Sequence, residues 1–67
     1  MDYDAILVSP IIYPVSKKGE VAIGHIKNDK KGRFVNGELV RTSLIEERII
    51  LEDGEYIRTM NTVYKVE

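Results

Sequence analysis

Two arginine–threonine pairs are the polar residues of this chain that most suggest chemistry. Asn36-Gly37-Glu38-Leu39-Val40-Arg41-Thr42 recurs with conservative changes as Asp53-Gly54-Glu55-Tyr56-Ile57-Arg58-Thr59. If the two copies formed neighbouring strands in similar register, Arg41 and Arg58 would share one face and could grip carboxylates or phosphates through paired hydrogen bonds. Tyrosine offers apolar area with a polar tip, which adds Tyr56 and Tyr64 to the candidate partner-binding residues. The alternative is that both arginines pair with nearby glutamates on a solvated face.

A second candidate surface is the basic segment 17–33, which holds six basic and two acidic residues, while the rest of the chain holds four basic and nine acidic ones. Such asymmetry can mark a basic face for nucleic acid, although lysines also gather in exposed turns because turns are wet. The candidate nucleic-acid contacts are Lys17, Lys18, Lys27, Lys30, Lys31 and Arg33.

No pattern of residues predicts catalysis. His25 is the only histidine and the chain has no cysteine, so a metal site would need carboxylates alone to complete it, and no metal-binding spacing occurs. The serines have no nucleophile-elbow context, and the five glycines are dispersed rather than gathered in a phosphate loop. We therefore expect no enzyme activity, no cofactor and no metal.

Length and composition predict one small domain over residues 1–67 with a net charge of −1. A chain of this size buries only about 60% of the surface that its unfolded form exposes, and a homodimer is one way to bury more. The acidic start has no basic region typical of a signal peptide, and the apolar stretch 5–15 is too short to span a bilayer. We expect a soluble, cytoplasmic protein that does not bind membranes.

Short β-prone runs separated by turns occupy the whole chain. Residues 5–8 form an apolar run that ends at Ser9-Pro10, and the prolines at 10 and 14 place this stretch at a sheet edge or a bulge. Gly24 within the next run indicates a bulge or a close backbone approach. The turns expected at Asn36-Gly37 and Asp53-Gly54 would form hairpins. Those hairpins would pair Phe34 with Leu39, Leu51 with Tyr56, and Ile50 with Ile57.

These runs predict an all-β fold: a small antiparallel meander of five to six strands, either a bent sheet or an SH3-like, partly open barrel. Closure of the sheet would protect its edges. The residues expected to form most of the core are Ile6, Val8, Val21, Ile23, Phe34, Val40, Leu51, Ile57 and Val63.

The C-terminal half resembles short uncharacterised proteins of bacteriophages and prophages. The resemblance lies in residues 32–45, which read Gly-Arg-Phe-Val-Asn-Gly-Glu-Leu-Val-Arg-Thr-Ser-Leu-Ile, and in residues 57–66, which read Ile-Arg-Thr-Met-Asn-Thr-Val-Tyr-Lys-Val. It implies a virus-encoded accessory protein that modulates a host protein, and it assigns no functional residue.

Two hypotheses follow from the sequence. The first is a non-enzymatic module that binds another protein, with a homodimer as one form of this. The alternative is a small nucleic-acid-binding β-barrel that uses the basic segment 17–33, where lysines would contact phosphates and a tyrosine would stack on a base.

Overall fold

The computed structural model describes residues 1–67, which form six strands and one short 3-10 turn. The strands are β1 (Ala5–Val15), β2 (Gly19–Lys27), β3 (Leu39–Arg41), β4 (Glu47–Leu51), β5 (Gly54–Arg58) and β6 (Val63–Val66), and the turn η1 (Ser16–Lys18) joins β1 to β2. They make a single sheet in the order β3-β2-β1-β6-β5-β4. Only β1 and β6 are parallel. The predicted all-β class is confirmed. The chain forms no helix long and apolar enough to cross a membrane.

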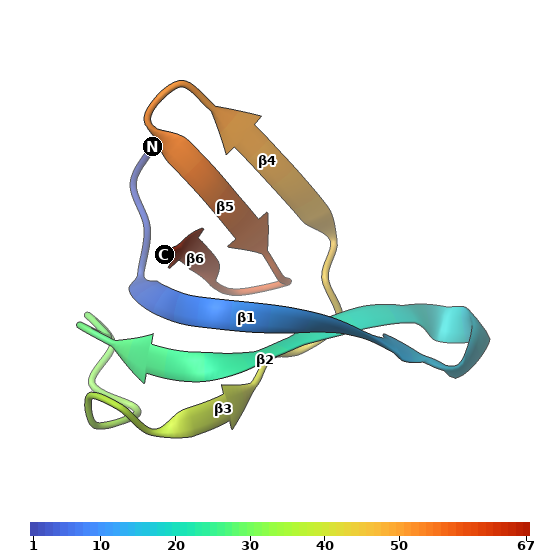
Figure 1. Cartoon of the computed structure of the whole chain (residues 1–67), viewed down its shortest axis with the longest axis horizontal. Helices are drawn as coiled ribbons and strands as arrows, with labels where there is room; N and C mark the ends of the chain where they lie inside the picture. The colour runs from blue at the N-terminus through green and yellow to red at the C-terminus, as the bar shows by residue number, and fades with distance from the viewer.

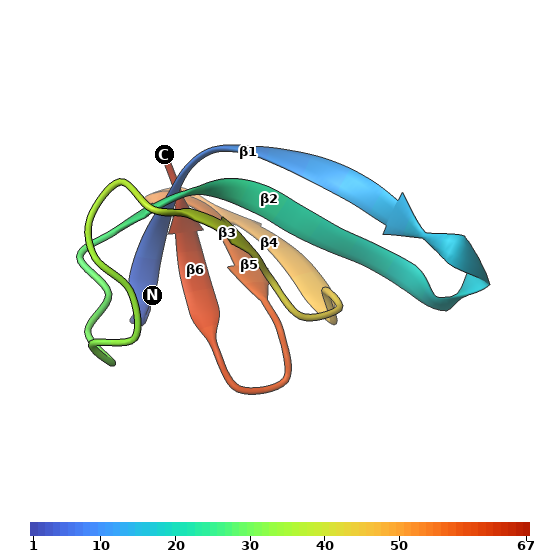
Figure 2. The ribbon, with the colours of Figure 1, turned by 90° about the horizontal axis from the view of Figure 1, so that it is seen from below.

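The sheet is open and strongly bent, with β4, β5 and β6 turned away from β1, β2 and β3 (Figures 1 and 2). Its two edge strands, β3 and β4, are consecutive in the chain. The linker between them, residues 42–46, contacts both sides of the bend. The Ile45 amide donates to the Glu20 carbonyl at 2.8 Å, and the Glu46 amide donates to the Arg58 carbonyl at 2.8 Å. The linker therefore fixes the angle between the two parts of the sheet.

A bulge in β1 turns the β1–β2 hairpin into a long arm that projects from the body (Figure 2). The pairing register of β1 with β2 shifts between Val8 and Ile11, and Ser9 has a positive φ of 47°. A Cβ on Gly24 would lie 3.0 Å from the Val8 carbonyl oxygen and 3.1 Å from the Pro10 Cα. The close backbone approach predicted at Gly24 is confirmed, because only glycine fits beside the bulge.

The core is one cluster of buried side chains from five of the six strands. Its fully packed members are Ala5, Leu7, Ala22, Ile26, Val40, Ile57 and Tyr64, with Ile12, Ile45 and Val66 packed against them. Of the nine core residues predicted, the buried ones are Ile6, Val21, Val40 and Ile57, while Val8, Ile23 and Val63 are half-buried. The prediction is wrong for Phe34 and Leu51, which are 37% and 45% exposed. Phe34 belongs to no strand, and Leu51 lies at the last pair of an edge hairpin.

Both predicted turns exist, but their surroundings differ from the prediction. The Glu38 amide donates to the Val35 carbonyl at 3.2 Å across Asn36-Gly37, and only Gly37 has a positive φ, 89°, which indicates a type II turn rather than type I′. No strand precedes this turn, so the predicted Phe34–Leu39 pair is wrong and β3 pairs with β2 instead.

The second turn is displaced by one residue. Leu51 pairs with Gly54, so Glu52 and Asp53 form the turn and Gly54, with φ 147°, begins β5. The predicted pairs of Leu51 with Tyr56 and Ile50 with Ile57 are therefore wrong. Ile49 lies opposite Tyr56, and Ile50 lies opposite Glu55.

Candidate functional site

The two arginines of the repeat do not lie on neighbouring strands. Arg41 is on β3 and Arg58 on β5, and the sheet order places β2, β1 and β6 between them. Arg58 Nη1 lies 2.7 Å from Glu46 Oε1, and its Nε lies 3.3 Å from Glu47 Oε1. Hydrogen bonds to Glu47 and then Glu46 raise the pKa of the Arg58 guanidinium. Arg58 thus follows the alternative that pairs it with glutamates, whereas Arg41 is exposed and makes no ion pair.

The tyrosines proposed to join these arginines are inside the protein. Tyr56 is 1% exposed and Tyr64 is 5% exposed, and Tyr64 belongs to the main core. Tyr56 lies beside Tyr3 in a tilted ring pair, with 6.4 Å between the ring centroids. Burial, followed by a contact with Asp53, raises the pKa of the Tyr56 hydroxyl. Both side chains are packing residues, which corrects the expectation that they contribute to a binding surface.

The basic segment is divided between two ends of the molecule. Lys17 and Lys18 lie in η1, at the tip of the projecting hairpin, whereas the loop after β2 lies at the other end of that hairpin (Figure 1). The residues near that other end are Lys27, Lys30, Lys31 and Arg33. The six candidate nucleic-acid contacts therefore do not form one continuous surface.

Most charges at the second end are already engaged within the protein. Lys27 pairs with Glu67, and Lys30 Nζ lies 4.3 Å from the centroid of the Tyr3 ring. Lys31 donates to the Asn61 carbonyl and to Thr62 Oγ1. These contacts attach the loop after β2 to the N-terminal segment and to the turn before β6.

Asp29 organises that loop. Its carboxylate accepts hydrogen bonds from the backbone amides of Lys31, Arg33 and Phe34, at 3.2, 2.8 and 3.2 Å, and it pairs with the Arg33 guanidinium at 3.3 Å. Burial alone would raise the pKa of Asp29, but the hydrogen bonds from Arg33 and Lys31 outweigh it and lower the pKa below its usual value. Arg33 is accordingly a structural partner of Asp29.

His25 has a structural contact and no metal-binding neighbours. Its Nδ1 lies 3.0 Å from the Gly37 carbonyl oxygen, which ties β2 to the turn before β3. No group of three or more His, Cys, Asp or Glu side chains is placed to hold a metal ion.

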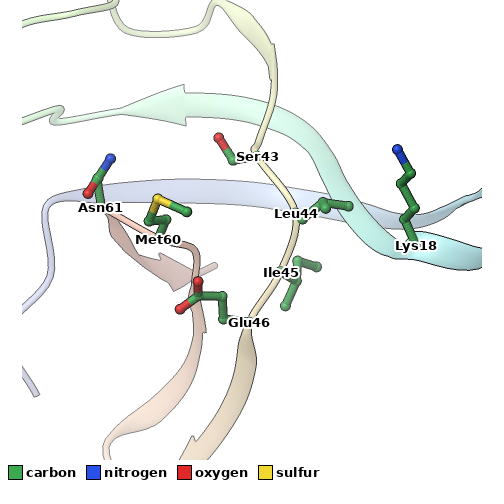
Figure 3. Close-up of a pocket in the computed structure, with 7 residues that line it drawn as sticks. All are labelled: Lys18, Ser43, Leu44, Ile45, Glu46, Met60 and Asn61. Atoms are coloured by element: carbon green, nitrogen blue, oxygen red, sulfur yellow. The ribbon is translucent and has the colours of Figure 1, made fainter.

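The structure brings together a group of residues that the sequence did not single out. An open hollow of about 520 Å³ lies where the linker 42–46 passes between the hairpin arm, near Lys18, and the turn before β6 (Figure 3). Its apolar lining comes from Leu44, Ile45 and Met60, and its polar lining comes from Lys18, Ser43, Glu46 and Asn61. We call these seven residues the linker hollow.

The linker hollow combines exposed apolar side chains with one basic and one acidic residue. Met60 is 74% exposed and Leu44 is 42% exposed, although both are large apolar side chains. Glu46 shares Arg58 with Glu47, whereas Lys18 makes no ion pair. Lys18 is therefore the one charged side chain of the lining without an ion-pair partner.

A sequence signal for this hollow was present but weak. Met60 stands between Thr59 and Asn61, within a turn, where no core position is available to a large apolar side chain. Leu44 lies three residues after the end of β3, where a large apolar side chain has no place in the sheet. Only the path of the linker across the bend brings these positions together.

Comparison with known proteins found no matching family model, no matching curated protein and no matching solved structure. The interpretation of the linker hollow therefore depends on its own residues.

Proposed function

We propose that the protein is a non-enzymatic interaction module, built on a bent SH3-like sheet, that binds another protein through the linker hollow. The observation that carries this proposal is the exposure of Met60 and Leu44 around an open depression of about 520 Å³. Large apolar side chains grouped at a hollow on a small protein mark an interaction site, and methionine adapts its shape to varied partners.

The chemistry of the hollow defines the partner. An aliphatic or aromatic side chain would fill the space between Leu44, Ile45 and Met60. A carboxylate next to that side chain would meet Lys18, whose ammonium has no partner within the protein. The expected partner is thus a protein surface that presents an apolar anchor beside an acidic residue. The resemblance to phage-encoded proteins makes a host protein the expected source of that surface.

Affinity capture from host lysate tests this proposal when it is run on matched variants. Met60→Lys places a charge in the centre of the hollow, and Lys18→Glu reverses the charge at its rim. Val35→Lys is the control, because Val35 is 72% exposed and lies in a turn away from the hollow. We expect one protein to be captured by wild type and by Val35→Lys and to be lost from the other two variants.

Nuclease treatment and salt separate this function from the alternative. A partner held at an apolar centre should still be captured after nuclease treatment, and its dissociation constant should rise little with salt. Binding through phosphates instead weakens by orders of magnitude as salt rises. Capture that is unchanged by Met60→Lys, or that disappears with nuclease, would contradict the proposal. Each variant must keep the wild-type circular dichroism spectrum for the comparison to count.

A further inference from the structure

The free edge of β4 is the least protected backbone of the sheet. β4 pairs with β5 on one side, and residues 47–51 make no backbone hydrogen bond outside the strands on the other. It carries two exposed apolar side chains, Ile50 at 81% and Leu51 at 45%. A free edge with exposed apolar residues is a ready template for another strand.

The other long free edge, in the outer part of β1, is protected by its sequence. Beyond Ser9, whose amide donates to the Glu67 carbonyl, β1 has no partner on the side away from β2. Pro10 and Pro14 have no amide hydrogen, so this edge lacks two of the donors that an added strand would need. β4 has no proline and no lysine. The contrast shows that one edge is closed to strand addition and the other is open.

The sequence of β4 and its turn is complementary to itself when reversed. Residues 48–52 read Arg-Ile-Ile-Leu-Glu, with a base at one end, an acid at the other and apolar residues between them. An antiparallel copy that sets Ile50 opposite its own equivalent also sets Ile49 opposite Leu51, and Arg48 opposite Glu52. Within residues 48–52, every charge then meets its opposite and every apolar residue meets an apolar one, while the next pair outward sets Glu47 opposite Asp53.

We propose that a second copy of this chain pairs with the β4 edge in this antiparallel register and continues the sheet across a two-fold axis. The surface is separate from the linker hollow, so this dimer goes beyond the proposed binding function.

The backbone pattern agrees with this register. The pair of Leu51 with Gly54 closes a two-residue turn, so the backbone groups of Leu51 and Ile49 face β5. Those of Ile50 and Arg48 then face the free edge, because successive residues alternate. The proposed register brings the Ile50 groups of the two copies together as a hydrogen-bonded pair.

Neighbouring registers fit less well. Setting Ile49 opposite its own equivalent places Arg48 against Ile50 and Glu47 against Leu51, so charged side chains meet apolar ones. Setting Arg48 opposite its own equivalent brings two like charges together, which destabilises a strand pair. The self-complementarity of residues 48–52 therefore selects one register.

The dimer should be a weak one. Two short strands bury less than the roughly 1,200–2,000 Å² of stable protein interfaces, and exposed ion pairs contribute little to stability. We expect a monomer–dimer equilibrium that shifts toward monomer on dilution.

Sedimentation velocity over a range of concentrations, on the full chain, tests the dimer with a pair of charge variants. Arg48→Glu gives each copy two acidic groups at the interface, and Glu52→Arg gives each copy two basic groups. Each variant alone should raise the dissociation constant of the dimer at least tenfold. An equimolar mixture should form a heterodimer at the wild-type concentration, because acidic ends then meet basic ends.

The apolar centre of the interface is tested by Ile50→Lys, with Val35→Lys as the control. Both side chains are highly exposed in the monomer, so neither change should alter the melting temperature of dilute protein. Only Ile50→Lys should abolish the dimer. Arg48→Glu also loses the intramolecular contact of Arg48 with Glu55, at 3.6 Å, so its melting temperature is measured in dilute solution as well.

Three results would overturn the proposal: a wild-type protein that stays monomeric at millimolar concentration, a dimer that survives Ile50→Lys, or charge variants that do not recover the dimer when mixed. Concentration-dependent amide shifts confined to the linker hollow or to β3 would assign the dimer to another surface and would equally reject the β4 edge.

Discussion

The two copies of the repeat, residues 36–42 and 53–59, end in strands that occupy different places in the sheet. β3, in the first copy, is an edge strand of three residues, whereas β5, in the second, lies between β4 and β6. The fourth residue of each copy shows the consequence. Leu39 is 62% exposed, but Tyr56 is 1% exposed and has the Tyr3 ring beside it. Equivalent residues of the two copies therefore differ in burial, because their tertiary contacts differ.

Other positions of the repeat behave alike in both copies. Val40 and Ile57 both belong to the core, and Thr42 and Thr59 are both buried. The repeat thus encodes a turn, a strand with one inward apolar residue, and a terminal threonine that hydrogen-bonds inside the protein. The arginine before each threonine has different surroundings in the two copies, because these depend on the tertiary structure.

The largest difference between the copies should appear in their core residues. Ile57→Ala removes a large side chain from the centre of the sheet and should lower the free energy of unfolding by about 2–5 kcal/mol. Val40→Ala removes a smaller side chain at an edge strand and should cost about 1–3 kcal/mol. Urea denaturation followed by circular dichroism measures both. Equal losses would mean that β3 is as central to stability as β5.

The turn glycines should rank next. Gly54, with φ 147°, is in a backbone region that other residues rarely adopt, and Gly54→Ala should cost about 1–3 kcal/mol. Gly37, with φ 89°, has nothing within 4 Å of an added Cβ, so Gly37→Ala should cost less and Gly37→Asn should be nearly neutral. Thermal melts of the three variants check this order. A Gly54→Ala melt equal to wild type would show that the turn relaxes freely.

Local sequence predicted the parts of the fold that depend on local chemistry. The turn at 36–37, the bulge in β1 and the close approach at Gly24 all follow from glycine and proline, which act on their own backbone, whereas the second turn lies at 52–53, one residue before its predicted place. The all-β class follows from the density of these turns and of β-branched residues.

What local sequence did not predict depends on contacts across long separations. Phe34 was assigned to a strand, but Asp29 holds its amide in a loop instead. The parallel pairing of β1 with β6 joins the two ends of the chain and separates the repeats in the sheet. The linker hollow exists only because residues 42–46 cross the bend, so no pattern within one segment could define it.

The buried threonines should give the third effect. Thr42 Oγ1 accepts a hydrogen bond from the Ala22 amide at 2.9 Å, so Thr42→Val leaves a buried amide without a partner and should cost about 1–3 kcal/mol. Thr59 Oγ1 makes only a 3.4 Å contact with the Thr62 carbonyl, whose bond to the Thr59 amide remains in Thr59→Val. Thr59→Val should therefore lower the free energy of unfolding by less than Thr42→Val. Amide exchange at Ala22 provides a local readout, and unchanged protection in Thr42→Val would contradict the argument.

Replacement of the arginines should have the smallest effect on stability. The two arginines should differ in their effect on partner binding. Arg41→Ala should leave both the melting temperature and the partner captured through the linker hollow unchanged, because Arg41 makes no ion pair and lies on another part of the sheet. Arg58→Ala should lower the melting temperature slightly and weaken capture, because it leaves the charge of Glu46 uncompensated at the hollow that an acidic partner must enter.

Replacement by lysine sharpens this last comparison. Arg58→Lys should recover only part of the binding, because one ammonium cannot reproduce the guanidinium contacts to both Glu46 and Glu47. Titration of the captured partner against each variant, at constant salt, measures the effect. A loss of binding in Arg41→Ala as large as that in Arg58→Ala, with the fold intact, would instead support the hypothesis that both arginines grip the partner directly.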